Sequence, residues 1–274
     1  WKRDKWNLLA KWYLFWAEGL AVKYSHIDIS DNEAIQDYTA ARYGTLSRVI
    51  EYGANHALNV KKTFEAEAKY PFLKQFYAFK VCRIEPENNV HFILEAFAQL
   101  KNIPLVMVGN WNRSMYGLQL REQYQQYTNI IMLDPIYEQK KLDMLRSNAG
   151  LYIHGHSAGG TNPSLVEAMY LKLPIIAFDV AYNKVTTENK ALYFKDIQDL
   201  KDKIKNISFD TLKNMSSQMF QIAEKRYQWS LIAQKYNALI QEALTIKAKS
   251  SIETEIGKLN YSDLLDLEIS HLKI

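Results

Sequence analysis

From Phe76 onward, the sequence alternates short apolar runs with helical patterns. This alternation is typical of a parallel sheet whose strands are joined by crossover helices. We expect strands at Tyr77–Cys82, Pro104–Val108, Ile130–Leu133, Leu151–His154 and Pro174–Ala177. Helices are expected at about Asn89–Leu100, Ser114–Tyr127, Glu138–Ser147, Pro163–Leu171, Ile197–Ile204 and Thr211–Tyr227. The pattern predicts an α/β domain built on a doubly wound parallel sheet.

The expected strand ends carry the first candidate contacts. In a doubly wound domain, ligands bind in the crevice at the carboxyl ends of the strands. Arg83, Gly109, Asp134 and Gly155 each lie just past the end of an expected strand. Four strands therefore direct candidate ligand contacts to one edge of the sheet.

The sequence before Phe76 is organised differently. It predicts a long aromatic helix from Lys2 to Tyr24, a strand at residues 27–30, a helix from Asp31 to Tyr43 and a strand at 48–52. These pieces look like the end of another α/β domain whose beginning is missing. We expect that remnant at residues 1–53, a linker at 54–75 and the sheet domain at 76–228. A further helix is expected from Trp229 to about Ile246, followed by a charged helical pattern to Ile274.

The first helix carries a broad apolar arc formed by Trp1, Leu8, Leu9, Trp12, Phe15, Trp16 and Leu20. We interpret this arc as a face that packs into a core. Contact with a membrane surface is the minority alternative, because the tryptophans are accompanied by Lys2, Arg3 and Lys5.

The segment Ile153–Met169, IHGHSAGGTNPSLVEAM, is the most informative about function. An apolar strand enters a loop with two adjacent glycines, Gly159 and Gly160, which allow the backbone to approach a ligand closely. Asn162 can cap the following helix, and Pro163 suits its first position. Since a helix start carries partial positive charge, the motif predicts a site for an anion such as phosphate.

Arg83 stands at the end of the first strand of the domain. A guanidinium suits a diphosphate because its planar fork donates two parallel hydrogen bonds and never deprotonates. The alternative is an ion pair with Glu85 or Glu87, which would be favoured for this residue alone. Because the glycine-rich loop is expected at the same edge of the sheet, we prefer the interpretation that Arg83 binds a diphosphate.

Glu167 follows the loop by about two helical turns, and its side chain leans back toward the crevice. A carboxylate there can accept hydrogen bonds from two ribose hydroxyls. The alternative is a solvated glutamate, yet its neighbours Leu165, Val166, Ala168 and Met169 are apolar, and a charge in such surroundings usually has a partner.

His154 and His156 are two residues apart and share a face if the chain is extended. No further ligands complete a metal site. We expect His156 to bind a sugar or phosphate, whereas for His154 a structural ring satisfied by the backbone is a serious alternative. Thr186, Thr187 and Glu188 resemble a helix start or turn and are assigned no chemistry.

The composition narrows the functional classes. The 274 residues are 48% hydrophobic, enough to bury a substantial core, and the net charge of +4 is spread without a long basic run. This does not suggest a nucleic-acid binder. Cys82 is the single cysteine, which excludes an internal disulfide and fits a reducing compartment, so we expect a cytoplasmic protein. No apolar stretch approaches the ~20 residues that span a bilayer.

The motifs together resemble a known family. Arg83 with IEPENN, then VGNW at 108–111, GHSAGGTNPSLVEAM and LPIIAFDV are similar to the nucleotide-sugar half of retaining GT-B glycosyltransferases of family four. GHSAGGTNPSLVEAMYL with TTENKALYF is closer still to bacterial rhamnosyltransferases that build capsule and surface polysaccharides. The match covers essentially the whole chain and is strongest over residues 76–195.

The resemblance implies roles for particular residues. Arg83 would bind the donor diphosphate and act in catalysis together with His156, and Glu167 would bind the ribose. The remaining donor contacts are expected at Asn88, Gly109, Asn110, Asp134, Gly159, Gly160, Thr161, Asn162 and Ser164. Two departures matter: many members carry a lysine where this chain has Asn88, and a glutamate where it has Gly159. A 6-deoxy sugar such as rhamnose is compatible with that altered pocket.

The implied fold is GT-B, with an incomplete N-terminal acceptor domain and C-terminal helices at 229–274 that cross back toward it. The implied reaction is retaining transfer of a sugar, L-rhamnose from dTDP-rhamnose, to a glycan or lipid-linked acceptor without a metal or other cofactor. We expect the chain to bind the nucleotide sugar but to transfer the sugar poorly. If the protein contacts a membrane, we expect this to be the inner face of the plasma membrane. A nucleotide-sugar epimerase of similar fold and a non-catalytic nucleotide-sugar binding protein are the alternatives.

Overall fold

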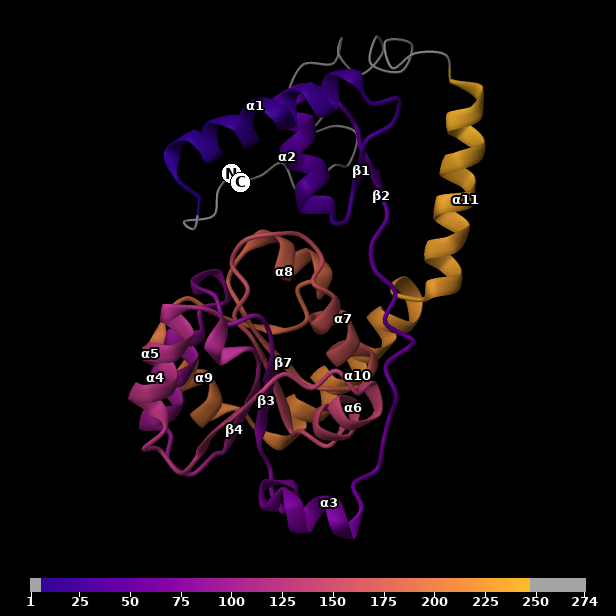
Figure 1. The fold of residues 1–274 in the computed structure, drawn as a ribbon. Coiled ribbons are helices and arrows are strands. Elements are labelled where there is room, and N and C mark those ends of the chain that lie inside the picture. Colours follow the sequence, from indigo (N-terminus) through magenta and orange to yellow (C-terminus); the bar gives the residue numbers. More distant parts are fainter. Residues whose placement is uncertain (1–5, 247–274) are drawn as a thin grey trace. The chain divides into compact units, whose positions relative to one another are not determined.

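The computed structural model describes residues 6–246, and the chain divides into two compact units (Figure 1). The larger unit is Gly53–Gln228, and the smaller unit combines Trp1–Tyr52 with Trp229–Ile274. The first residues of the expected N-terminal helix, including Trp1, Lys2, Arg3 and Lys5, and the charged pattern after Ile246 lie outside the described residues.

A six-stranded sheet forms the centre of the larger unit. Its strand order is β5-β4-β3-β6-β7-β8, and all five neighbouring pairs are parallel. The strands are β3 (Ala78–Val81), β4 (Leu105–Val108), β5 (Ile130–Leu133), β6 (Leu151–His154), β7 (Ile175–Phe178) and β8 (Leu192–Phe194). The doubly wound α/β fold predicted from the alternating pattern is confirmed. Every expected strand of this domain is present, and β8 is an addition at the sheet edge.

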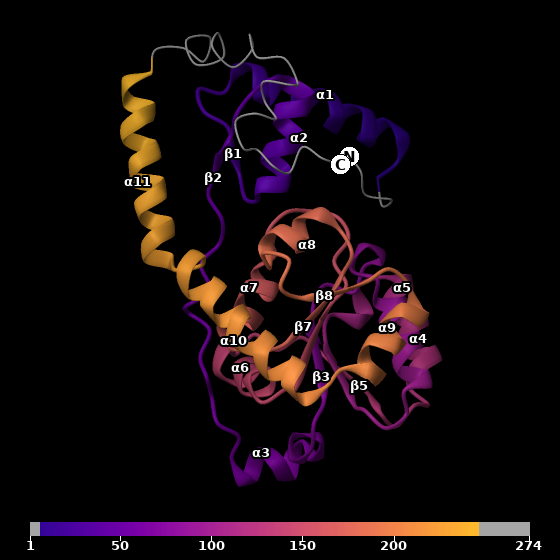
Figure 2. The same cartoon turned by 180° about the vertical axis from the view of Figure 1, so that it is seen from behind.

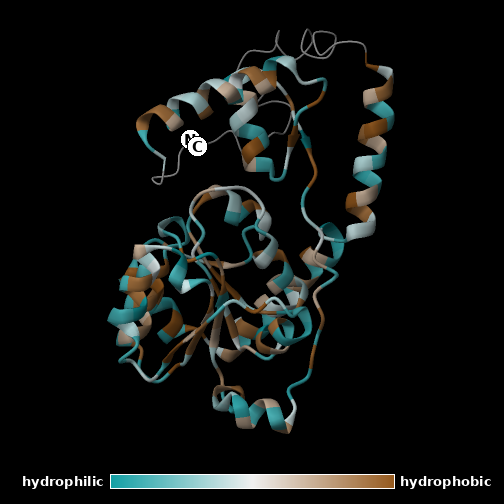
Figure 3. Ribbon diagram, viewed as in Figure 1, coloured by the Kyte–Doolittle hydropathy of each residue, from teal (hydrophilic) through white to brown (hydrophobic). Residues whose placement is uncertain are grey.

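Helices cover both faces of this sheet (Figure 2). One core contains side chains of α6 (Gln139–Ser147), α7 (Pro163–Tyr170) and α10 (Phe209–Arg226), and the other contains side chains of α4 (Val90–Gln99), α5 (Met115–Tyr124) and α9 (Ile197–Asn206). The strands between them are largely brown in Figure 3, as expected for strands buried on both faces. Short helical segments complete the unit: α3 (Phe64–Lys69), α8 (Ala181–Thr186), and the 3₁₀ turns η1 (Pro71–Lys74), η2 (Pro86–Asn88) and η3 (Trp111–Arg113).

One segment of the larger unit differs from expectation, and for a second the structure decides between two interpretations. Residues 54–75, expected to be a linker, contain α3 and η1, and Phe72 and Leu73 are buried in the core with Tyr77. Of the two interpretations of the cluster Thr186–Glu188, a helix start or a turn, the structure shows the turn: Thr186 ends α8 and Thr187 caps its C-terminus. Glu188 then adopts a left-handed φ of 48°, so the cluster is the turn that leads to β8.

The smaller unit contains α1 (Leu8–Tyr24), β1 (Ile29–Ser30), α2 (Glu33–Tyr43), β2 (Arg48–Val49) and α11 (Trp229–Thr245). β1 and β2 form a parallel pair. Two ion pairs attach α11 to the segment at β2: Arg48 Nη2 lies 2.5 Å from Glu242 Oε1, and Lys235 Nζ lies 2.5 Å from Glu51 Oε2. The first and last parts of the chain therefore belong to one unit.

The apolar arc of α1 does not pack into a core as expected. Trp12 and Trp16 are 67% and 53% exposed, and Leu8 and Leu9 are more exposed still. Within the described part of this helix, only Val22 is buried. Helix α1 contacts α2 through Glu18, which accepts hydrogen bonds from Tyr38 and Tyr43, and through Phe15, whose ring centroid lies 3.8 Å from the Arg42 guanidinium.

Candidate functional site

A cavity of about 330 Å³ lies at the carboxyl ends of β3 and β6. These two strands are neighbours in the sheet, so the residues that follow them meet. The cavity is lined by Val81, Cys82, Arg83, Asn88, His154, His156, Asn162, Pro163 and Ser164. Arg83 and the N-terminus of α7 thus border one space, as the two sequence motifs predict. Five of the expected site residues line it: Arg83, Asn88, His156, Asn162 and Ser164.

The N-terminus of α7 is held by a set of polar contacts. Asn162 caps the helix, because its Oδ1 accepts hydrogen bonds from the backbone N–H of Ser164 at 3.0 Å and from its hydroxyl at 2.8 Å. The hydroxyl of Tyr152, from β6, donates to Ser164 Oγ at 3.0 Å. Burial raises the pKa of Tyr152, which keeps this hydroxyl protonated and able to donate. The positive end of the helix therefore borders the cavity in a fixed orientation.

Asn88 connects Arg83 with His156. Its Nδ2 donates to the backbone carbonyl of Arg83 at 2.8 Å, and its Oδ1 lies 3.0 Å from His156 Nδ1. Because the amide oxygen can only accept, this arrangement assigns the N–H of the His156 ring to Nδ1. The amide thus occupies the position where the resembling family carries a lysine, and it orients both the strand end and the imidazole.

The Arg83 side chain is available to a ligand. Within the described residues, it forms no ion pair with Glu85 or Glu87, the alternative partners considered from the sequence. The residue is exposed at the surface while it lines the cavity. Beside it, burial raises the pKa of the Cys82 thiol, so the wall of the cavity at this point is an uncharged sulfur.

Glu167 has two partners that sequence reasoning missed. Arg146 Nη1, from α6, donates to Glu167 Oε2, and His56 Nε2 lies 2.9 Å from Glu167 Oε1. The Arg146 guanidinium is completely buried, and its Nη2 also donates to Asp143 Oδ1 at 2.6 Å. The expectation that a carboxylate in apolar surroundings has a partner is therefore correct, and that partner is an arginine.

The segment that carries His56 is fastened to α6. Leu58 N donates to Asp143 Oδ2 at 2.9 Å, and Val60 exchanges hydrogen bonds with the hydroxyl of Ser147 at 3.2 and 3.0 Å. Asn148 Nδ2 adds a bond to the carbonyl of Val60 at 2.8 Å. Residues 56–60 therefore lie along α6 in a defined register, which places His56 beside Glu167.

Other expected contacts lie outside the cavity lining. Asp134 Oδ1 pairs with Arg121 at 2.8 Å at the surface, and Asn110 precedes η3 without a capping bond from its side chain. Gly109 packs closely, since an added Cβ would lie 2.7 Å from the carbonyl oxygen of Cys82. Both Gly109 and Asp134 follow strands on the far side of β3 from β6, which separates them from the loop after β6.

The glycine loop lies against the His156 ring. A Cβ added at Gly159 would lie 2.7 Å from His156 Nε2, closer than real side chains approach. The imidazole therefore takes the room that a side chain at position 159 would need. Gly160 and Thr161 continue the loop, and Thr161 is buried. Neither of these two residues lines the cavity.

Two asparagines that the sequence analysis did not single out hold the loop after β6. Asn89 Nδ2 donates to the carbonyl of Gly155 at 2.9 Å, and Asn183 Nδ2 donates to the carbonyl of His156 at 2.9 Å. Both are buried. No local pattern indicated these roles, because Asn89 follows the polar segment EPEN and Asn183 lies in the mostly polar segment AYNKVT.

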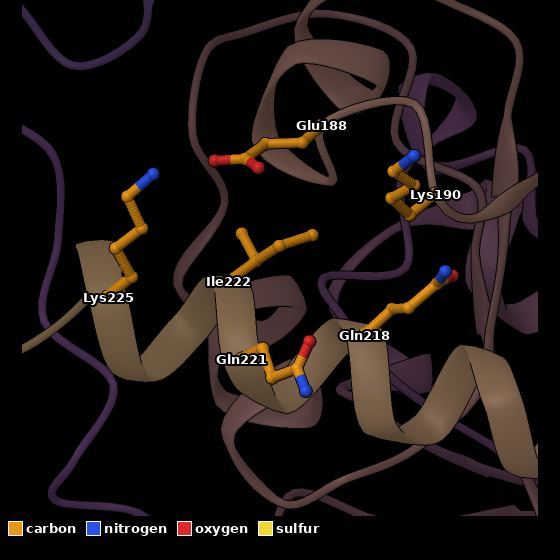
Figure 4. A pocket seen from close by; sticks show the side chains of 6 residues that line it. All are labelled: Glu188, Lys190, Gln218, Gln221, Ile222 and Lys225. Carbon is orange, nitrogen blue, oxygen red and sulfur yellow. The ribbon is translucent and has the colours of Figure 1, made fainter.

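A second hollow, of about 280 Å³, lies between the turn after α8 and helix α10 (Figure 4). It is lined by Glu188, Lys190, Gln218, Gln221, Ile222 and Lys225. Figure 4 shows Glu188 and Lys190 approaching from the turn, opposite the side chains of α10. None of the expected site residues belongs to this hollow.

Metal-binding clusters and membrane-spanning helices are both absent from the residues that the structure describes. Residues 6–246 contain no group of three or more histidine, cysteine, aspartate or glutamate side chains placed to hold a metal ion. No helix in the same range is long and apolar enough to cross a membrane.

Comparison with protein families identifies the larger unit. Residues 62–226 match the family described as glycosyl transferases group 1. The chain belongs to this family. Residues 1–55 match a domain of unknown function (DUF1972). Among curated proteins, none matches the sequence.

Solved structures agree with membership of the group 1 family at the level of the fold. Sucrose-phosphate synthase from Thermosynechococcus elongatus superposes with a TM-score of 0.73 at 17% identity, over 89% of this chain and 63% of that protein. HepE from Anabaena, solved with UDP and glucose, superposes with a TM-score of 0.70 at 17% identity, over 84% of this chain and 66% of HepE. The pneumococcal O-GlcNAc transferase GtfA, solved with UDP and GlcNAc, superposes with a TM-score of 0.57 at 16% identity, over 80% of this chain and 46% of GtfA. The chain thus has the GT-B glycosyltransferase fold and spans less than two thirds of the length of the first two relatives.

Proposed function

We propose that this chain binds a nucleotide sugar in the cavity at the ends of β3 and β6 and serves a glycosyltransferase reaction. The observation that carries the proposal is that Arg83 and the N-terminus of α7 line the same cavity. A guanidinium and a helix N-terminus are both complementary to a diphosphate. HepE and GtfA, which share the fold, were solved with UDP, and this supports a nucleoside diphosphate as the ligand class.

The chemical task of this site is to stabilise a departing diphosphate. As the bond between the anomeric carbon and the diphosphate oxygen breaks, negative charge grows on the leaving group. The acceptor hydroxyl oxygen forms the new glycosidic bond, and its proton passes to the departing diphosphate. Groups fixed around that charge lower the barrier because they need no reorganisation. Arg83 supplies a permanent charge, and α7 supplies its dipole. Asn88 keeps the Arg83 backbone and the His156 ring in place.

Glu167 is proposed to accept the ribose hydroxyls. Its ion pair with the buried Arg146 fixes the orientation of the carboxylate. The other oxygen, Oε1, contacts His56, a partly exposed side chain. A ribose approaching Oε1 therefore competes with an imidazole rather than with the buried arginine.

For the transferred sugar we propose L-rhamnose from dTDP-rhamnose, moved with retention to a glycan or lipid-linked acceptor in polysaccharide synthesis. The support is the resemblance of GHSAGGTNPSLVEAMYL to rhamnosyltransferases, together with Gly159, where a hydroxyl-binding glutamate is replaced. The His156 ring beside Gly159 is proposed to contact the sugar instead. We further propose that no metal is required and that the protein works in the cytoplasm, for which the support is its single, free cysteine.

Calorimetry on the 274-residue chain tests the proposal. UDP, dTDP, GDP and their sugar conjugates are titrated into the wild type and into the Arg83→Ala and Lys225→Ala variants. We expect at least one nucleoside diphosphate to bind, with dTDP-rhamnose preferred. Loss of Arg83 should cost about 1.5–3 kcal/mol, roughly 10- to 100-fold in Kd. Lys225 lies in the second hollow, so Lys225→Ala should leave Kd unchanged. Equal binding by the Arg83→Ala variant, or a loss confined to Lys225→Ala, contradicts the proposal.

A further inference from the structure

His154 is a buried histidine whose ring is not hydrogen-bonded. It is the last residue of β6 and is 2% exposed. Both ring nitrogens, Nδ1 and Nε2, are buried and have no hydrogen-bond partner within the described residues. The ring stacks on Tyr152, with centroids 6.1 Å apart, and meets His156 edge to face at the same separation. The alternative considered from the sequence, a ring satisfied by the backbone, is wrong.

An unpaired histidine at this position is costly to the fold. A buried polar group without a partner loses its hydrogen bonds to water and gains none in return. Ala177, the partner of His154 in the neighbouring strand β7, is apolar and fully buried, so an apolar side chain suits this position. The histidine is therefore explained by something other than the stability of the free protein.

The cavity supplies the explanation. His154 lines it together with Arg83 and the N-terminal residues of α7. We propose that the His154 ring is a ligand contact, whose N–H donates a hydrogen bond to an oxygen of the nucleotide sugar's diphosphate. The proposal rests on the function proposed above and adds to it a third diphosphate contact, placed on the β6 side of the cavity.

The protonation state of the ring suits this role. Burial, together with the charges of Lys80 and His156, holds the pKa of His154 well below its ordinary value. The ring is therefore neutral at pH 7, and a neutral imidazole carries one N–H in either tautomer. It contributes a directed hydrogen bond without a further charge, while Arg83 contributes the charge. A neutral donor adds specificity for the position of a phosphate oxygen at little electrostatic cost in the free protein.

Three variants test the proposal, with thermal unfolding of the ligand-free chain and calorimetric binding of UDP, dTDP and inorganic pyrophosphate as readouts. His154→Leu should raise the Tm or leave it unchanged, while it weakens binding of the nucleoside diphosphate at least tenfold. His154→Gln keeps an N–H donor and should bind within about threefold of the wild type. His91→Leu is the matched control: the His91 ring bonds the hydroxyl of Tyr116 at 2.8 Å, so its loss should lower the Tm and leave Kd unchanged.

Each outcome has a defined meaning. A His154→Leu variant with a lower Tm and an unchanged Kd overturns the proposal, because the ring is then structural. If its Tm and affinity fall together, His154→Gln decides: affinity near that of the wild type supports the ligand contact, and affinity as weak as that of the Leu variant overturns it. If the wild type binds none of the three probes, the proposed function is refuted as well. If the wild type and His154→Leu bind the probes with equal affinity, only this inference is refuted.

Discussion

Arg146 and Glu167 form an ion pair in which the guanidinium is completely buried and the carboxylate reaches the surface. Arg146 belongs to α6, and Glu167 belongs to α7, beside the candidate diphosphate cavity. The carboxylate therefore has one side anchored in the core and one side, occupied by His56, that a ligand can reach.

Replacement of Arg146 by methionine should destabilise the protein strongly. It leaves the buried Asp143 and the partly buried Glu167 without their shared counter-charge, and breaking a buried pair in this way costs about 3–5 kcal/mol. Urea unfolding of Arg146→Met measures the loss. Arg121→Ala is the control, because its pair with Asp134 is exposed and should be worth less than about 1 kcal/mol. Equal effects of the two variants would show that the buried pair has no special weight.

Removal of the His56 side chain should tighten nucleotide binding. His56 Nε2 lies 2.9 Å from Glu167 Oε1, the oxygen proposed for the ribose, so His56→Ala removes a competitor. One hydrogen bond of this kind is worth about 0.5–1.5 kcal/mol, roughly 2- to 10-fold in Kd. Titration of UDP or dTDP measures the effect, with the exposed His26→Ala variant as control. Weaker binding by His56→Ala would indicate that the imidazole supports the ligand rather than competing with it.

A side chain at position 159 should displace the His156 ring. The added Cβ of Gly159→Ala would lie 2.7 Å from His156 Nε2, and such overpacking costs about 1–3 kcal/mol. Both the melting temperature and the affinity for the donor should therefore decrease. Gly19→Ala is the matched control: there a Cβ meets only Tyr43 Cε1 at 3.7 Å within helix α1, where alanine is favoured over glycine. A Gly159→Ala variant with unchanged stability and affinity would show that the loop moves freely away from His156.

The sequence predicted the parts of the fold that rest on strong local patterns. The five strands predicted from the sequence are mostly apolar, although β3 contains Lys80 and β6 ends at His154, and the helices between them have clear apolar periods. β8 was missed because it is a three-residue edge strand, and α8 because its six residues, AYNKVT, are mostly polar and carry no capping side chain. The exposure of the α1 tryptophans was not predictable, since an apolar arc indicates burial without showing what would cover it.

The candidate site could be predicted where it depends on strand ends and not where it depends on distant pairs. Arg83 and Asn162 meet because β3 and β6 are adjacent. Asp134 was expected nearby, but β5 lies two strands from β3. The partners of Glu167 are 21 and 111 residues away in sequence, so no local pattern indicates them. The helical period of α6 does not distinguish an arginine that points into the core from one that faces solvent.

Stability should depend on pH through His154. Its pKa lies well below the ordinary value of 6.5 because burial and the charge of Lys80 disfavour the protonated ring. Below about pH 6.5 the unfolded chain takes up a proton that the folded chain does not, so the free energy of unfolding falls as the pH decreases. This group contributes up to about 1.4 kcal/mol per pH unit. Urea unfolding between pH 5 and 7.5 should show a shallower decline for His154→Leu than for the wild type. If the stability of the wild type and that of His154→Leu decline in parallel with pH, the His154 ring is in contact with water in the folded protein.

A crystal structure of the chain with a bound nucleoside diphosphate is the most direct test of the central claim. The account predicts that the diphosphate lies between the Arg83 guanidinium and the first turn of α7, with a phosphate oxygen within hydrogen-bond distance of the His154 ring. A diphosphate bound elsewhere, for instance between Lys190 and Lys225 in the second hollow, or an Arg83 side chain directed away from the ligand, would contradict it.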